Sequence, residues 1–154
     1  MHDLLAQGDL EESLSLRGSH VLVVDDSWVA RRAIARLLLP HGCIIHDARD
    51  TGFARQVLRE TSIDVILLDL ILPGESGLSF CTRLSSEGMT ERTPVVVISG
   101  NSTSENVVQA IRAGASFFLV KPLQEESLVR VLRGLLRQYN NPITSLSLGI
   151  GSIQ

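Results

Sequence analysis

Five polar side chains that follow apolar runs of the chain are of types that could do chemistry together. Clustered carboxylates repel one another unless a cation neutralises them, and such oxygen ligands select Mg²⁺ over soft metals. Mg²⁺ beside a carboxylate, a hydroxyl and a lysine can neutralise the oxygens of a transferring phosphoryl group. One of the carboxylates can itself accept that group, although this chemistry alone does not decide which one. The five side chains are Asp25, Asp26, Asp69, Ser99 and Lys121.

The elements that must position these side chains follow from an alternation of short apolar runs and stretches of helical periodicity. Five repeats of strand and helix predict an α/β fold with a doubly wound parallel sheet and helices on both faces. The flavodoxin-like strand order 2-1-3-4-5 fits five strands best. The predicted strands cover residues 20–24, 43–46, 63–68, 94–98 and 117–120. The predicted helices cover residues 29–38, 53–60, a stretch ending near 84, 105–112 and 125–138.

Ligands of an open parallel sheet bind at the carboxyl ends of its strands, near the point where the strand order reverses. Each of the five polar side chains stands at such an end, so we expect them on one rim. Taken singly, an aspartate there can be only a helix cap, and a serine or lysine can be only solvated. Their joint placement favours a site. By contrast, Arg31, Arg32 and Arg36 fall on the side of the first helix away from its apolar positions.

Composition limits the remaining function classes. The 154 residues correspond to one domain, and 44% hydrophobic with 20% charged residues is ordinary globular usage. A net charge of −3 argues against a nucleic-acid or membrane surface. Cys43 and Cys81 match no metal or disulfide spacing. We expect a cytoplasmic protein with an N-terminal extension at 1–18, a folded domain at 19–140 and a C-terminal tail at 141–154.

Four motifs resemble the receiver domain of two-component response regulators, in the order and at the spacings of that family. The resemblance covers about residues 19–140 and is specific because all four motifs occur together. The motifs are VLVVDDS at 21–27, VILLDLILPGESG at 65–77, PVVVISG at 94–100 and GASFFLVKP at 114–122.

The resemblance implies a role for each residue of the rim. Asp69 is the expected phosphoacceptor, and Ser99 is expected to donate its hydroxyl to the phosphoryl group. Lys121 is expected to pair with a phosphoryl oxygen. The resemblance also implies a cis peptide bond before proline at Lys121–Pro122, a form that X–Pro bonds can take. Mg²⁺ is the expected cofactor, and its implied ligands are the side chains of Asp25, Asp26 and Asp69 and the backbone carbonyl of Ile71.

The resemblance further implies a switch and a route for the phosphoryl group. Ser99 is expected to move toward the phosphoryl group, and Phe118, in place of the commoner tyrosine, is expected to turn inward. Gly100 leaves space for the group to enter. Ile71 and Asn101 flank the route by which water would reach an aspartyl phosphate, and their types predict slow self-dephosphorylation.

The expected function is therefore that of a single-domain response regulator. It would accept a phosphoryl group from a histidine kinase or phosphotransfer protein and change its binding to a downstream protein. Alternatives are a phosphorelay intermediate that passes the group on and a phosphorylation-independent scaffold. A phosphatase of the haloacid-dehalogenase type would need a second aspartate where Ile71 stands. We expect no enzymatic turnover beyond self-phosphorylation from a donor and self-dephosphorylation, and no direct binding to nucleic acid or membrane.

Overall fold

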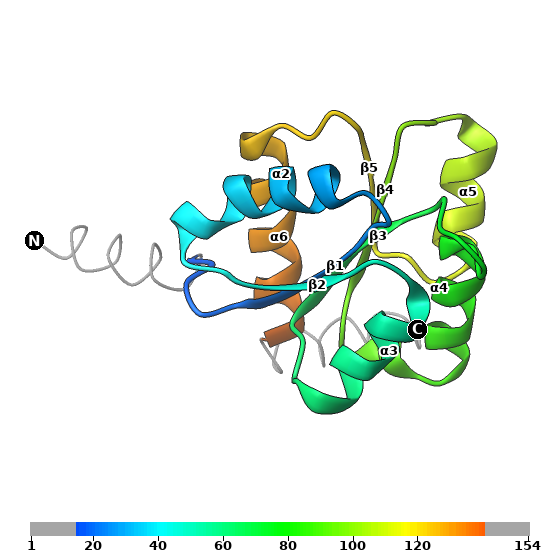
Figure 1. The fold of residues 1–154 in the computed structure, drawn as a ribbon, viewed down its shortest axis with the longest axis horizontal. Helices are drawn as coiled ribbons and strands as arrows, with labels where there is room; N and C mark the ends of the chain where they lie inside the picture. The colour runs from blue at the N-terminus through cyan, green and yellow to red at the C-terminus, as the bar shows by residue number, and fades with distance from the viewer. Residues whose placement is uncertain (1–14, 141–154) are drawn as a thin grey trace, which may run out of the picture.

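The computed structural model describes residues 15–140, in which strands and helices alternate along the chain (Figure 1). Two short 3₁₀ turns, η1 (Leu39–His41) and η2 (Met89–Glu91), follow the first and third helices. The expected elements are all present, with ends that differ by a few residues. In chain order the main elements are β1 (His20–Val24), α2 (Trp28–Leu38), β2 (Ile44–Ala48), α3 (Thr51–Glu60), β3 (Val65–Asp69), α4 (Gly77–Ser86), β4 (Val95–Ser99), α5 (Ser104–Arg112), β5 (Phe117–Val120) and α6 (Glu125–Asn140).

The five strands form one parallel sheet in the order β2-β1-β3-β4-β5, which confirms the expected topology. The order reverses between β1 and β3, so the ends of these two strands lie side by side. In the register of the sheet, Val24 pairs with Leu68, Asp69 with Ile98 and Ser99 with Val120. Asp69 and Ser99 are thus the last residues of their own strands, rather than the first residues after them.

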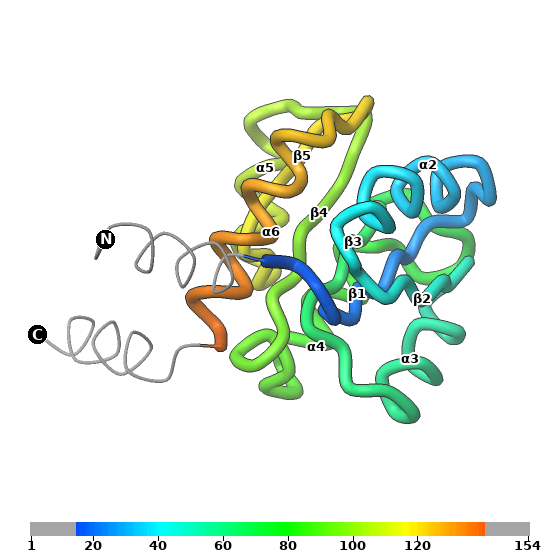
Figure 2. The backbone as a smooth tube through the Cα atoms, turned by 90° about the vertical axis from the view of Figure 1, so that its left-hand side faces the viewer, coloured from blue at the N-terminus to red at the C-terminus, as the bar shows by residue number. Residues whose placement is uncertain are grey.

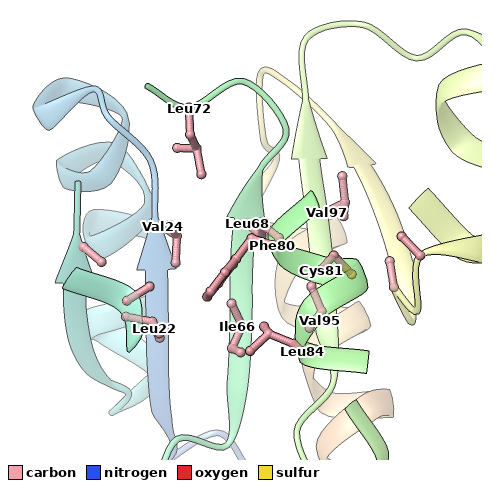
Figure 3. Close-up of a cluster of buried hydrophobic side chains, with 14 of the residues drawn as sticks. Leu22, Val24, Ile66, Leu68, Leu72, Phe80, Cys81, Leu84, Val95 and Val97 are labelled. Carbon is pink, nitrogen blue, oxygen red and sulfur yellow. The ribbon is translucent and has the colours of Figure 1, made fainter. Parts of the chain in front are cut away.

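Two hydrophobic layers cover the sheet, one on each face. Alternate residues of β1 divide between them, because successive side chains of a strand point to opposite faces. Leu22 and Val24 pack toward α3, α4 and α5, where Phe80 of α4 is fully buried (Figure 3). Val21 and Val23 pack on the other face, toward α2 and α6. Because the central strands are buried on both faces, their sequences are nearly continuous apolar runs.

The core also includes a residue upstream of the expected domain start. The side chain of Leu16 is 1% exposed and belongs to the same hydrophobic cluster as Leu132 and Leu136 of α6. In Figure 2 the first described residues begin where they overlap α6 and then lead away from it into β1. Gly18 N donates to Gly42 O at 2.8 Å and ties this segment to the turn before β2. The chain therefore joins the fold before residue 19, while residues 1–14 and 141–154 lie outside the described part.

The N-cap residues of α2 and α5 lie a few residues after the carboxyl ends of β1 and β4. Ser27 Oγ accepts a hydrogen bond from Ala30 N at 3.2 Å and starts α2, and Thr103 Oγ1 accepts one from Asn106 N at 3.2 Å and starts α5. The loops from β1 to α2 and from β4 to α5 are therefore short, whereas residues 70–76 form a longer loop between β3 and α4. Within residues 15–140, no helix is long and apolar enough to cross a membrane.

Candidate functional site

Three carboxylates meet at the carboxyl ends of β1 and β3. One oxygen from each of Asp25, Asp26 and Asp69 lies within 4.8 Å of the others. Asp25 is buried with 3% of its surface exposed, Asp26 is exposed, and the Asp69 side chain is 12% exposed. The sequence separates Asp25 and Asp69 widely, and the pairing of β1 with β3 brings them together.

Lys121 completes this cluster from the end of β5. Its Nζ donates to Asp25 Oδ2 at 2.9 Å and lies 3.5 Å from Asp69 Oδ2. The Lys121 backbone N–H donates to Ser99 O at 2.9 Å, which links the end of β5 to the end of β4. The peptide bond between Lys121 and Pro122 is cis. One ammonium therefore pairs with two of the three carboxylates, which leaves an excess of negative charge in the cluster.

Asp25 is held at every polar atom. Its Oδ1 accepts a hydrogen bond from Ser27 N at 2.9 Å, and its Oδ2 accepts the one from Lys121. Its backbone N–H donates to Ala48 O at 3.0 Å, and its carbonyl oxygen accepts from Arg31 Nη1 at 2.6 Å. Contacts from β2, α2 and the residue after β5 thus hold both the backbone and the side chain of Asp25 in one position.

Arg31 is the residue that sequence reasoning missed. Helical periodicity predicts it on the side of α2 away from the apolar positions, yet its side chain is only 13% exposed and turns back to Asp25. The signal that could have found it is its place in the first turn of α2, where long side chains point back toward the helix N-terminus.

The charges of the cluster shift two ionisation equilibria. Burial, together with the negative charge of Asp25, raises the pKa of Asp69 above its usual range, against the lowering influence of Lys121 and of the hydrogen bond from Ile71 N. Burial would lower the pKa of Lys121, but its hydrogen bond to Asp25 and the charges of Asp25 and Asp69 raise it. The cluster therefore favours the charged form of Lys121 and disfavours the negative charge of Asp69.

These observations fit a hard divalent cation. The donor set is entirely carboxylate oxygen, and a strained negative charge on Asp69 would be relieved by a second positive charge. Among the described residues, no other group of three metal-ligating side chains comes this close together. Asp25, Asp26 and Asp69 are the residues that would hold the ion.

The remaining predicted site residues lie around the cluster. Ser99 is 2% exposed, and its Oγ accepts a hydrogen bond from Asn101 N at 3.1 Å. Ile71 N donates to Asp69 Oδ1 at 3.3 Å, while the Ile71 side chain is 76% exposed. Gly100 has open space where a Cβ would stand. Phe118 is half-buried and packs against the hydrophobic layer toward α3, α4 and α5.

A family model described as "Response regulator receiver domain" matches residues 21–133, which include all of the sheet but its first residue and the whole carboxylate cluster. The chain belongs to the response regulator receiver family. The resemblance inferred from the four motifs is thereby confirmed.

Two curated relatives illustrate the range of proteins that carry this receiver domain. The chain is 32% identical over 121 residues to the phosphate regulon transcriptional regulatory protein PhoB of Pseudomonas aeruginosa, a match covering 79% of this chain and 53% of PhoB. It is 28% identical over 118 residues to protein PilH of the same species, covering 77% of this chain and 98% of PilH. The chain thus spans about half the length of PhoB and nearly the full length of PilH.

Solved structures agree with the receiver fold. The chemotaxis protein CheY4 of Vibrio cholerae matches with a TM-score of 0.71 at 26% identity, covering 77% of this chain and 98% of CheY4. A Francisella response regulator receiver domain matches with a TM-score of 0.73 at 25% identity, covering 79% and 98% of the two chains.

Proposed function

We propose that this receiver domain accepts a phosphoryl group on Asp69 and that the modification changes its binding to a partner protein. The single observation that carries the proposal is the position of the Asp69 carboxylate, which is 12% exposed, 3.5 Å from Lys121 Nζ and grouped with Asp25 and Asp26. Membership of the response regulator family supports a histidine kinase or a phosphotransfer protein as the donor.

The transfer itself needs a nucleophile and a place for negative charge. An oxygen of Asp69 attacks the phosphorus, and the bond from phosphorus to the donor's nitrogen breaks, with its electron pair leaving on the donor. The charged Lys121 ammonium, already between Asp25 and Asp69, binds a phosphoryl oxygen. Mg²⁺ held by the three carboxylates would neutralise further charge on the phosphoryl oxygens.

A switch through Ser99 and Phe118 is supported by how β4 and β5 are joined. Ser99 Oγ is held by Asn101 N, and Ser99 O accepts from Lys121 N, so a hydroxyl recruited by the phosphoryl group would pull on both connections. Phe118 pairs with Val97 in the same two-stranded ladder. Reversing a 1:99 equilibrium needs about 5.5 kcal/mol. A few hydrogen bonds to a charged group, at about 1.5–3 kcal/mol each, are sufficient.

The proposal is tested by phosphorylation with a small-molecule donor. Wild-type protein incubated with acetyl phosphate and Mg²⁺ is expected to gain the mass of one phosphoryl group in intact mass spectrometry. The same incubation with EDTA is expected to leave the mass unchanged, because the carboxylates then repel the incoming phosphoryl oxygens. A wild-type protein that gains no mass from acetyl phosphate or from a panel of histidine kinases would contradict the proposal and favour the scaffold alternative.

The phosphorylated form is expected to lose its phosphoryl group slowly, with a half-life of minutes or longer. The exposed side chain of Ile71 offers no hydrogen bond to an attacking water, and exposed Asn101 offers no basic group. Intact mass measured over time after removal of acetyl phosphate gives the rate. Ile44→Ala, at an exposed isoleucine of the edge strand β2, serves as a control that should not change it. A half-life of seconds in the isolated protein would contradict this expectation.

A further inference from the structure

Arg31 differs from the two other arginines of α2 in burial and in contacts. Its Nη1 donates to Asp25 O at 2.6 Å, and its Nε lies 3.9 Å from Asp47 Oδ1 of β2, with its side chain 13% exposed. Arg32 and Arg36 are exposed. Arg31 therefore lies between the carboxylate cluster and the edge strand, where the other two arginines face solvent.

The carbonyl that Arg31 binds belongs to the peptide unit that joins Asp25 to Asp26. A peptide unit is planar, so a fixed oxygen also fixes the direction in which the chain enters Asp26. The bond is short and comes from a charged donor, which is the stronger kind of hydrogen bond. Within residues 15–140, no hydrogen bond or ion pair holds the carboxylate of Asp26, so its position depends on this backbone.

Charge alone would give Arg31 the opposite effect on a bound cation. A guanidinium close to the carboxylates repels Mg²⁺, so its removal would tighten binding if it acted only through charge. Replacing a residue that has no role in the site would leave the Mg²⁺ affinity unchanged. Moreover, Arg31 Nε is buried with no hydrogen-bond partner among residues 15–140, which is an unfavourable arrangement for a residue kept only for stability. The three possibilities therefore differ in the Mg²⁺ affinity that they predict for a variant without Arg31. The affinity falls if Arg31 positions a ligand, rises if Arg31 acts only through its charge, and stays the same if Arg31 has no role.

We propose that Arg31 is a positioning residue for the divalent cation site. It holds the Asp25–Asp26 peptide so that the Asp26 carboxylate stands beside those of Asp25 and Asp69. Asp47 of β2 adds an ion-pair contact, with its Oδ1 3.9 Å from Arg31 Nε. This inference rests on the proposed function, because it assumes that the three carboxylates bind Mg²⁺.

The test is a titration with Mg²⁺ alone, followed by calorimetry and by the fluorescence of Trp28. Trp28 is the single tryptophan of the chain and stands two residues after Asp26. Arg31→Met is expected to weaken Mg²⁺ binding by about tenfold, as loss of a residue that orients metal ligands does. Arg31→Lys keeps a cationic donor and is expected to recover part of the affinity. Arg36→Met, an exposed arginine of the same helix, is the matched control and should bind as wild type does.

Each outcome separates the alternatives. Equal or tighter Mg²⁺ binding by Arg31→Met would overturn the positioning role, and so would an Arg31→Lys variant that binds no better than Arg31→Met. Thermal melts establish that each variant is folded, and Arg31→Gln replaces Arg31→Met under the same criterion if the latter does not fold. Failure of the wild-type protein to bind Mg²⁺ would instead overturn the proposed function.

Discussion

Asp69→Asn is expected to abolish phosphorylation while it stabilises the fold. The asparagine side chain has nearly the same shape as that of aspartate, but its amide cannot attack phosphorus to form an acyl phosphate. The stabilisation follows from the surroundings of Asp69, since burial and the charge of Asp25 raise its pKa and outweigh the favourable contact with Lys121. A neutral amide at this position removes that unfavourable charge.

The gain in stability depends on pH in a definite direction. Because the pKa of Asp69 is higher in the folded protein than in the unfolded chain, the folded state binds more protons between the two values. The wild type therefore gains stability from this group as the pH falls and loses it as the pH rises through the folded-state pKa. The difference between Asp69→Asn and wild type should be largest at neutral pH and vanish below about pH 3.8, the ordinary pKa of an aspartate.

Two measurements check the two halves of this prediction. Intact mass after incubation with acetyl phosphate and Mg²⁺ should show no addition to Asp69→Asn. Glu105→Gln, which makes the same acid-to-amide change at an exposed residue, should be phosphorylated as wild type is. Urea denaturation at several pH values gives the stability. Phosphorylation of Asp69→Asn would show that another residue is the acceptor, and a less stable variant at neutral pH would contradict the electrostatic argument.

Gly77→Ala is expected to lower the free energy of unfolding by about 3 kcal/mol, the upper part of the usual cost of overpacking a core. Gly77 is the buried first residue of α4, and its N–H donates to Leu70 O at 2.9 Å. A Cβ at this position would stand 2.0 Å from Asp69 O and 2.8 Å from Leu70 Cα. Both contacts are with backbone, so no side-chain rotation relieves them. Because the displaced peptide carries Asp69, phosphorylation should slow as well.

Gly134→Ala is the matched control for this prediction. Gly134 lies inside α6, and no atom of the described part of the chain stands within 4 Å of the Cβ that alanine would add. Since alanine is the better helix former by about 1 kcal/mol, this variant should be more stable than wild type. Urea denaturation of both variants gives the comparison. A Gly77→Ala protein as stable as wild type would show that the loop before α4 moves aside without cost.

The elements of this fold could be predicted from the sequence because the signals that define them are local. An apolar run such as 20–24 is too short for a helix and is followed by Asp25 and Asp26, and periodicity marks α2 and α6. The alternation of these elements predicted the strand order and placed Asp69 and Lys121 at strand ends, and four motifs in order then indicated the family and the role of each residue. The ends of individual elements were less certain, since the hydrogen bonds of a strand come from its neighbours. Asp69 and Ser99 accordingly proved to be the last residues of β3 and β4.

Tertiary structure alone decided which of these side chains touch and which others join them. The hydrogen bond from Lys121 to Asp25 joins residues 96 positions apart, and the sequence offers no means of choosing Asp25 over Asp69 as the nearer partner. The burial of Leu16 in the cluster that includes α6 and the hydrogen bond from Arg31 to Asp25 likewise depend on tertiary packing. Residue type and spacing determine the local conformation and the chemistry at each strand end. The distances between strand ends depend on sheet pairing and packing, which bring distant parts of the chain together.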